Sequence, residues 1–287
     1  FALSGKDEKL LPEIVKSATV AGEYNGIKVI KVAGHDTQCA VCAMPSTSDK
    51  VSAFLSCGTW SLIGCENDKP ILTDKSMNDE LSNELGANGK INYLKNISGL
   101  WLIQEIRRNF KAEGKEYSYN DMEQLARKEK PFGFFIDPDD PNFATPGGMP
   151  EKIRDFCKKT GQKIPNADGE LIRCIYESLA MKYKYAIEQI ESNTEKKFEV
   201  LHLLGGGTKD TFLCQMTADS LNIPVIAGPT EATALGNIML QLIALGDIKS
   251  VDEGRKIIRE QEKTATYYPE NAKSFSDGYE KFKQIIK

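Results

Sequence analysis

Histidines and clustered metal ligands are scarce in this sequence. Its 287 residues include only two histidines, and no set of His, Cys, Asp or Glu stands at the spacing of a zinc site. A Ser–His–Asp signature is missing as well. Cys39-Ala-Val-Cys42 is a single CxxC pair, and a helix there would place both sulfurs on one face, which favours packing in a core. We therefore predict no protein-built metal site.

Positive charge and long apolar runs are also lacking. Lys and Arg total 37 against 41 Asp and Glu, and they are scattered rather than striped, which argues against a nucleic-acid partner. No apolar run approaches the roughly 18–20 residues of a transmembrane helix, and no signal peptide is visible. Seven cysteines beside so few histidines suggest free thiols in a reducing compartment. We expect a cytoplasmic protein with no membrane partner, and leave open whether Cys157 and Cys174 pair.

The most informative stretch surrounds a glycine-rich turn. Val200–Leu204 has the length and apolar character of a strand, and Gly205-Gly206-Gly207 follows it directly. Thr208–Leu221 carries apolar residues at helical spacing, and Ile223–Ala227 is a second short strand ending in a Gly-Pro turn. A further helix follows, for which Thr230 is the predicted N-cap. The repeated order of strand, glycine turn and helix predicts a parallel α/β sheet.

The three glycines suit a bound nucleotide, because bare backbone N–H groups at a helix N-terminus attract phosphate. The usual motifs are nevertheless incomplete. A Walker loop needs Gly-Lys-Ser/Thr where Lys209-Asp210 stand, and a dinucleotide fingerprint needs glycine at position 210. A tight turn that binds nothing is the alternative interpretation.

Polar residues also follow a predicted strand near the start of the chain. Ile27–Ala33 is β-branched and leads into Gly34-His35-Asp36-Thr37. The carboxyl end of such a strand is where α/β sheets bind ligands, so Asp36 is a candidate catalytic carboxylate. The competing interpretation is that Asp36 caps the helix that follows.

A hairpin and several helices complete the expected elements. Val51–Cys57 and Trp60–Cys65 read as two strands whose tip, Gly58-Thr59, is either a simple turn or a phosphate-contacting loop. Ile91–Lys95 reads as a strand before a helix capped by Asn96 or Ser98. Three segments are expected to be irregular: a loop-rich start over 10–23, an ordered segment over 131–150, and a weakly periodic tail after Thr264. Two further helices are expected, an amphipathic one over 169–191 and one that begins at a Ser250–Glu253 capping box. The helix after Thr230 should face inward with Leu235, Ile238, Met239, Leu242 and Ile243.

Five blocks, in this order and spacing, resemble the FGGY carbohydrate kinases. The resemblance covers nearly the whole chain and implies an actin-like, ribonuclease-H-type α/β fold in which two domains close over a cleft. It further implies that residues 1–46 are the tail end of the N-terminal domain, and that residues 47–287 are the C-terminal nucleotide-binding domain. A start at Phe1 rather than Met agrees with a missing N-terminal portion. The blocks are Gly34–Thr37, Ser56–Ser61, Leu94–Gln104, Gly205–Gly207 and Gly228–Asn237.

The resemblance also implies a role for individual residues. Asp36 would be the catalytic base, accepting the proton of a ketose 1-hydroxyl as it attacks the γ-phosphoryl group of ATP. Relatives commonly carry Asn where Asp210 stands, so an acidic group there puts the adenine contact in doubt. The other implied contacts are His35, Thr37 and Asn96 to the sugar, and Thr59, Gln104 and Gly206 to the nucleotide.

The resemblance thus implies an ATP-dependent sugar kinase that uses Mg²⁺. Within the family the resemblance implies L-rhamnulose as the sugar, with L-rhamnulose 1-phosphate as product and a role in rhamnose catabolism. The Leu94–Gln104 block best separates the sequence from glycerol and xylulose kinases, while the choice of sugar depends largely on the missing N-terminal domain. One alternative is a related kinase acting on L-fuculose or another ketose. Another is a nucleotide-binding module that is inactive on its own, because half of a closing site is missing. The sequence leaves the oligomeric state open.

Overall fold

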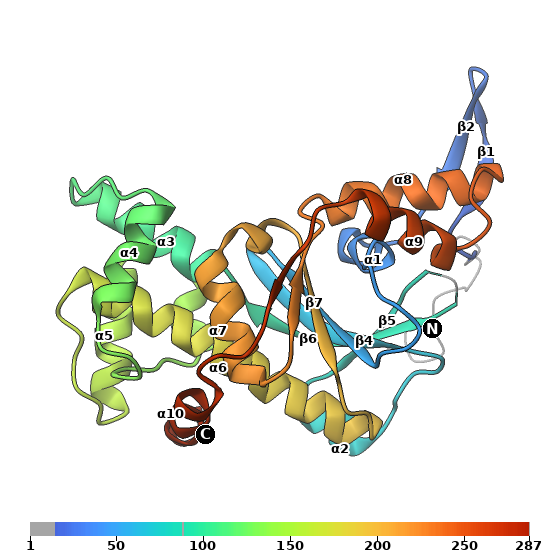
Figure 1. The fold of residues 1–287 in the computed structure, drawn as a ribbon. Helices are drawn as coiled ribbons and strands as arrows, with labels where there is room; N and C mark the ends of the chain where they lie inside the picture. Colours follow the sequence, from blue (N-terminus) through green and yellow to red (C-terminus); the bar gives the residue numbers. More distant parts are fainter. Residues whose placement is uncertain (1–14, 88, 287) are drawn as a thin grey trace, which may run out of the picture.

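A seven-stranded mixed sheet forms the centre of the computed structural model, which describes residues 15–87 and 89–286 (Figure 1). The strand order is β5-β6-β4-β3-β7-β8-β9. Only β3, β7 and β8 run parallel; every other neighbouring pair is antiparallel. The predicted α/β sheet is therefore confirmed, although it is parallel only in its middle. The strands are β3 (Ser52–Cys57), β4 (Trp60–Asn67), β5 (Ser82–Leu85), β6 (Ile91–Ser98), β7 (Val200–Leu204), β8 (Val225–Ala227) and β9 (Ala265–Tyr267).

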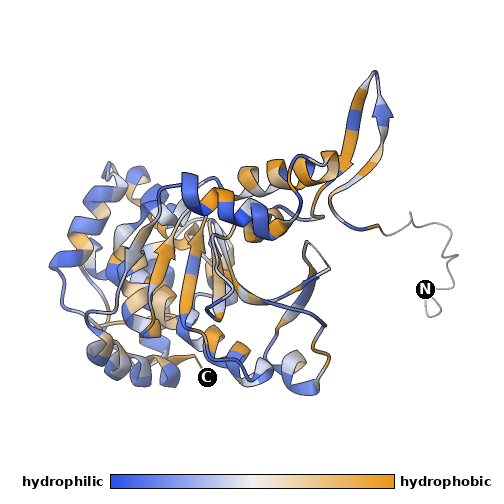
Figure 2. Ribbon diagram, turned by 45° about the vertical axis from the view of Figure 1, so that its right-hand side comes forward, coloured by the Kyte–Doolittle hydropathy of each residue, from blue (hydrophilic) through white to orange (hydrophobic). Residues whose placement is uncertain are grey.

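Helices cover both faces of the sheet, because successive residues of each strand point to opposite sides. In β3, Leu55 belongs to the core on one face and Phe54 to the core on the other. Figure 2 shows largely apolar strands in the middle of the body, covered by helices that carry both hydrophobic and hydrophilic residues. The first face carries α6 (Asp168–Thr194), α7 (Thr211–Leu221) and α10 (Ala272–Ile285); the second carries α1 (Asp36–Cys42), α8 (Ala232–Leu245) and α9 (Val251–Gln261).

A lobe of shorter helices lies beside α6, away from the second face (Figure 1). The predicted irregular segment 131–150 runs through it and is ordered by its own aromatics, since Phe135 and Phe143 are buried. Its middle forms the 3-10 turn η2, and its end enters α5. The elements of this lobe are α3 (Trp101–Ala112), α4 (Tyr119–Lys128), η2 (Pro141–Ala144) and α5 (Met149–Lys159), while the short helix α2 (Asp74–Asn78) lies at the other end of α6.

The start of the described chain differs from the prediction. Thr19–Tyr24 is a strand, β1, and not a loop. It pairs with β2 (Ile27–Lys31) in a separate two-stranded sheet that projects from the body (Figure 1). Asp36 therefore follows a strand, as predicted, but that strand is not part of the large sheet. Residues 10–14 of the expected loop lie outside the described residues.

Two predicted helix caps are wrong. Asn96 and Ser98 do not cap α3, because both belong to β6, which pairs with β4 as far as Trp60↔Ser98. The N-terminus of α3 is instead held by Thr59, whose carbonyl oxygen accepts from the backbone N–H of Gly99 and Trp101. Thr230 does not cap α8, which begins at Ala232 after Glu231. At Asn96 and Ser98, strand pairing outweighs the local cap signal.

The second half of the chain is more regular and more buried than predicted. Helix α6 extends over 27 residues and is buried on most sides, because it lies between the sheet, α4, α7 and α10. The tail after Thr264 contains β9 and α10, and the latter buries Phe275, Tyr279 and Phe282. On α8, Ile238 was predicted to face inward, but its side chain is 53% exposed, so the prediction is wrong at that position. The predicted start of α9 is confirmed, since Ser250 Oγ accepts from Glu253 N.

All seven cysteines are buried free thiols, so Cys157 and Cys174 are not bridged. The predicted packing role of the CxxC pair is confirmed, because Cys39 and Cys42 are both buried between α1 and the second face. Within residues 15–87 and 89–286, we find no helix whose length and apolar content would suffice to cross a membrane.

Candidate active site

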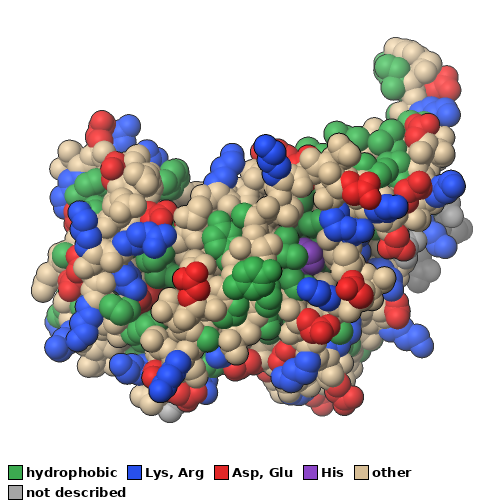
Figure 3. Space-filling view, in the orientation of Figure 1, with side chains coloured by type: hydrophobic (Ala, Val, Ile, Leu, Met, Phe, Trp, Pro, Cys, Tyr) green, Lys and Arg blue, Asp and Glu red, His purple; other side chains and the backbone are tan. Residues whose placement is uncertain are grey.

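A cavity of about 810 Å³ opens where β3 and β7 end and β4 begins. Since β3 and β7 are parallel neighbours, with Ser56 opposite Leu204, the turns that follow them meet at the same edge of the sheet. Figure 3 shows the surface notched between the lobe of α3 and α4 and the part that carries α8. Six of the seven predicted site residues line this cavity: His35, Asp36, Thr37, Thr59, Asn96 and Gly206.

Asp36 presents an accessible carboxylate to this cavity. It is the first residue of α1, and the N-cap position belongs to His35, so the capping interpretation is wrong. Asp36 Oδ1 accepts from Thr37 N at 2.7 Å, and His35 Nε2 lies 3.4 Å from the same oxygen. The side chain remains 75% exposed. One carboxylate oxygen is thus held by the backbone while the group stays available to a ligand.

The glycine turn after β7 contains one glycine that the fold does not explain. Gly205 has φ +85°, a conformation that favours glycine. At Gly207, a Cβ would lie 2.4 Å from Cys57 Sγ, so a side chain would collide with β3. At Gly206 φ is ordinary and a Cβ would meet nothing within 4 Å. Since Gly206 lines the cavity, space for a ligand is the remaining reason for a missing side chain there.

We therefore expect Gly206→Ala to weaken nucleotide binding without loss of stability. A methyl group would project into open space in the folded protein and into the ligand when the cavity is filled. The affinity for ADP should fall about tenfold, equivalent to ~1.4 kcal/mol, while the free energy of unfolding changes by less than about 0.5 kcal/mol. Calorimetric titration with ADP and urea denaturation measure the two quantities. Unchanged ADP affinity would show that Gly206 does not face the nucleotide.

Gln104, the seventh predicted residue, does not line this cavity. It lies on α3 and faces a neighbouring cavity of about 570 Å³ together with Arg107, Arg108 and Lys111. Its Oε1 accepts from Thr59 Oγ1 at 3.5 Å, and Thr59 lines the first cavity. Thr59 at the hairpin tip therefore links the two cavities. Its hydrogen bond to Gln104 connects the seventh predicted residue to the other six.

Asp210 is directed away from the cavity into the protein. Its Oδ1 accepts from Leu213 N at 3.0 Å and caps α7, while Tyr176 donates its hydroxyl to Oδ2 at 2.7 Å. Burial is the largest cause of a raised pKa at this carboxyl. Asp210 is thus a buried helix cap, which accounts for an acidic residue three positions after the last of the glycines.

Sequence reasoning missed several residues that line the cavity. Trp60 is 59% exposed although it begins a sheet strand, and an exposed large aromatic in such a position is unusual. Glu231 directly precedes α8 and Thr233 is its second residue; both lie in the Gly228–Asn237 block, but neither was assigned a contact. No Lys or Arg belongs to the lining among the described residues, and its carboxylates are those of Asp36 and Glu231. Burial raises the pKa of the Cys57 thiol to about 12, so this cysteine is not a nucleophile.

Comparison with known proteins identifies the family. Residues 53–245 match the model of the C-terminal domain of the FGGY family of carbohydrate kinases. The chain belongs to this family. The match spans β3 to α8 and includes the hairpin tip, the glycine turn and Asn96, whereas α1 with Asp36 precedes it.

Curated relatives of this FGGY chain carry the name rhamnulokinase. It is 39% identical to the Bacteroides thetaiotaomicron protein over 287 residues, which is all of this chain and 58% of that protein. It is 45% identical to the Bacillus subtilis protein over 232 residues, 81% of this chain and 47% of that protein. The chain thus spans about half the length of the curated relatives it matches.

Solved structures of sugar kinases share the fold. A xylulose kinase from Rhodospirillum rubrum superimposes with a TM-score of 0.73 at 16% identity, over 99% of this chain and 58% of its own. A Plasmodium falciparum glycerol kinase with ADP gives a TM-score of 0.69 at 15% identity, over 95% of this chain and 56% of the glycerol kinase chain. The FGGY chain therefore has the actin-like fold of these kinases, and the predicted fold class is confirmed.

Proposed function

We propose that this chain supplies the nucleotide site and the catalytic base of a kinase that transfers the γ-phosphoryl group of ATP to L-rhamnulose, forming L-rhamnulose 1-phosphate. The observation that carries the proposal is the exposed Asp36 carboxylate, which shares one cavity with Thr59 and Gly206. The choice of sugar is supported by the names of the relatives at 39% and 45% identity.

The proposed reaction uses the two sides of the cavity differently. The sugar would lie beside His35, Asp36, Thr37 and Asn96, so that its 1-hydroxyl donates a hydrogen bond to Asp36. The oxygen of that hydroxyl attacks the γ-phosphorus, the bond to the β-phosphate oxygen breaks, and the hydroxyl proton passes to the carboxylate. Since phosphoryl transfer has a loose transition state, alignment of the two reactants is the main contribution of these residues.

The phosphate side would consist of backbone and hydroxyl groups. Thr59 at the hairpin tip and Gly206 at the glycine turn flank the cavity edge where β3 and β7 end. The lining supplies no Lys or Arg among the described residues, so phosphate charge needs another counter-charge. Mg²⁺ fits this environment, because it is commonly held by one or two carboxylates together with substrate phosphates. Since Asp36 is assigned to the sugar hydroxyl, Glu231 is the carboxylate of the lining that would help to hold the ion, which would supply charge neutralisation of the phosphates.

We further propose that residues 1–46 are the tail end of a preceding domain and residues 47–287 the nucleotide-binding domain. The β1–β2 sheet supports this division, since it stands outside the large sheet and exposes Tyr24 and Ile27 by 72% and 71%. A cytoplasmic location is part of the proposal and is supported by seven unbridged thiols. Helix α1 nevertheless packs on α8 of the second part, so Asp36 is held by the nucleotide-binding side.

A coupled ADP-release assay tests the proposed activity. The chain is incubated with Mg-ATP and L-rhamnulose, with L-fuculose and D-xylulose as competing ketoses. We expect turnover selective for L-rhamnulose when the complete cleft is present. A higher turnover with L-fuculose would change the assigned substrate but leave the assigned reaction, phosphoryl transfer from ATP to a ketose, unchanged. If no ADP is released with any of the three sugars, but the protein still binds ADP, the alternative of a nucleotide-binding module that is inactive alone is favoured. The absence of both ADP release and nucleotide binding would contradict the proposal.

A further inference from the structure

Helix α1 has to be held by the rest of the protein, because it is too short to be stable alone. It contains seven residues, roughly 10 Å of helix. Asp36 is its first residue, and no side chain of the described residues caps the N-terminus. The direction of the proposed catalytic carboxylate therefore depends on contacts made further along the helix.

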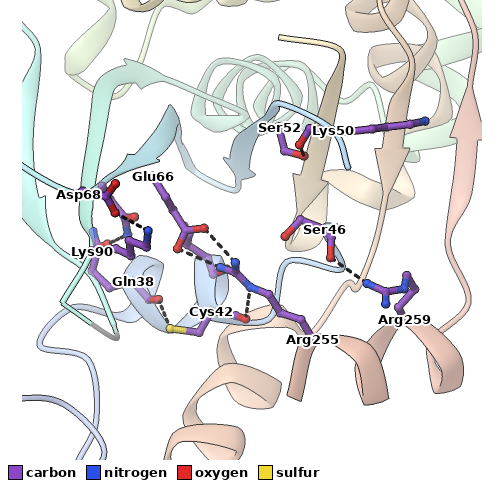
Figure 4. Close-up of polar contacts among 12 residues, drawn as sticks. Gln38, Cys42, Ser46, Lys50, Ser52, Glu66, Asp68, Lys90, Arg255 and Arg259 are labelled. Carbon is purple, nitrogen blue, oxygen red and sulfur yellow. Dashed lines mark hydrogen bonds and ion pairs between the residues drawn. The ribbon is translucent and has the colours of Figure 1, made fainter. Parts of the chain in front are cut away.

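The C-terminal end of α1 is held by Arg255 of α9 (Figure 4). The guanidinium donates to the carbonyl oxygens of Val41 at 2.9 Å and Cys42 at 3.1 Å. These are backbone acceptors at a helix end, where carbonyls lack partners within the helix and a positive charge is favourable. Arg255 is 9% exposed, so these contacts are shielded from water.

The same guanidinium is paired with Glu66 on the sheet. Arg255 Nη1 lies 2.9 Å from Glu66 Oε2, and Nη2 lies 3.0 Å from Oε1. A two-point Arg–carboxylate contact fixes both distance and orientation. Glu66 lies near the end of β4, the strand whose other end follows the Gly58-Thr59 tip. One side chain thus joins the helix that carries Asp36 to the strand that carries the phosphate-side hairpin.

We propose that Arg255 is a positioning residue that sets the place of Asp36 relative to Thr59. It lies at the opposite end of α1 from Asp36 and acts through the helix, without touching the substrate. This inference rests on the proposed function, because it requires Asp36 to be the base.

Kinetics of two matched variants test the proposal, in the complete polypeptide as its gene encodes it. Arg255→Met removes the contacts to α1 and to Glu66. A displacement of Asp36 by about 1 Å should lower kcat by about 100-fold, with the KM for Mg-ATP changed less than about twofold. The control is Arg259→Met one turn later on α9. Among the described residues its guanidinium donates to Ser46 O alone, at 2.8 Å, beyond α1 (Figure 4). Its kcat should stay within about twofold of the unmodified protein.

A double-variant cycle separates positioning from general stability. If Arg255 acts through Asp36, Arg255→Met should lower the residual turnover of Asp36→Asn protein less than about threefold, because the two effects are not additive. Arg255→Lys should restore only part of the loss, since one ammonium group cannot hold two carbonyls and a carboxylate in this geometry. If the Met variant does not fold, Glu66→Gln and Arg255→Lys decide the question through the same kcat comparison.

Each outcome has a distinct meaning. A kcat for Arg255→Met equal to that of Arg259→Met, with Asp36→Asn inactive, would overturn the positioning role and leave the proposed function intact. Multiplicative losses in the double variant would overturn it as well. Full turnover by Asp36→Asn would instead remove the base assignment, and the positioning role with it. Faster amide hydrogen exchange over residues 36–42 in Arg255→Met, but not in Arg259→Met, would support the positioning role of Arg255 without an activity measurement.

Discussion

Asp36→Asn is expected to lower kcat for sugar phosphorylation by about 10²- to 10⁴-fold, the usual range for loss of a general base. The amide keeps the size of the side chain and can still accept from Thr37 N, as Asp36 Oδ1 does at 2.7 Å. It cannot take up the proton of the sugar hydroxyl. Nucleotide affinity should remain within about twofold, because Thr59 and Gly206 are unchanged. Steady-state kinetics and ADP titration measure the two effects.

Asp74→Asn is a suitable control for this variant. Asp74 is also the first residue of a short helix, α2, and it is exposed, but it does not line the cavity. Its removal should leave kcat within about twofold, since an exposed helix-terminal charge contributes less than ~1 kcal/mol. A kcat for Asp36→Asn close to that of Asp74→Asn would contradict the role of Asp36 as base.

Gly236→Ala is expected to destabilise the fold by about 3 kcal/mol or more, beyond the usual range for an overpacked core. Helices α1 and α8 approach so closely there that a Cβ on Gly236 would lie 1.8 Å from the carbonyl oxygen of Cys39. A backbone atom cannot turn aside, so the two helices would have to separate. Because α1 carries Asp36, kcat should fall together with stability. Urea denaturation of the variant measures the first effect.

Gly254→Ala and Gly206→Ala provide a graded comparison. At Gly254 the new Cβ would lie 2.0 Å from Met239 Sδ, but this side chain is flexible and can move. At Gly206 nothing lies within 4 Å. The loss of stability should therefore be largest at position 236, intermediate at 254 and negligible at 206. Equal unfolding free energies for the 236 and 206 variants would show that the approach of α1 to α8 is not tight.

Local signals predicted the elements around the cavity well. Strand β7 has the bounds expected from its apolar run, and the hairpin around Gly58-Thr59 is present. These predictions succeeded because strand length, apolar character and glycine turns are properties of adjacent residues. Caps were predicted less well, because the Ser250 cap of α9 is present but those at Asn96 or Ser98 and at Thr230 are not. Whether Asn96 begins a helix or continues a strand depends on its pairing opposite Leu62, more than 30 residues earlier in the chain.

The sequence by itself determined the family and six of the seven residues expected to meet at one cavity. Only the tertiary structure decided how they are held. It placed β2 outside the large sheet, turned Asp210 inward as a cap, and left Gln104 in a neighbouring cavity. It also brought Arg255 to the end of α1, across 214 positions of sequence from Val41. The physical reason is that backbone propensity depends on neighbours in the chain, whereas the direction of a short helix depends on packing and buried hydrogen bonds from distant segments.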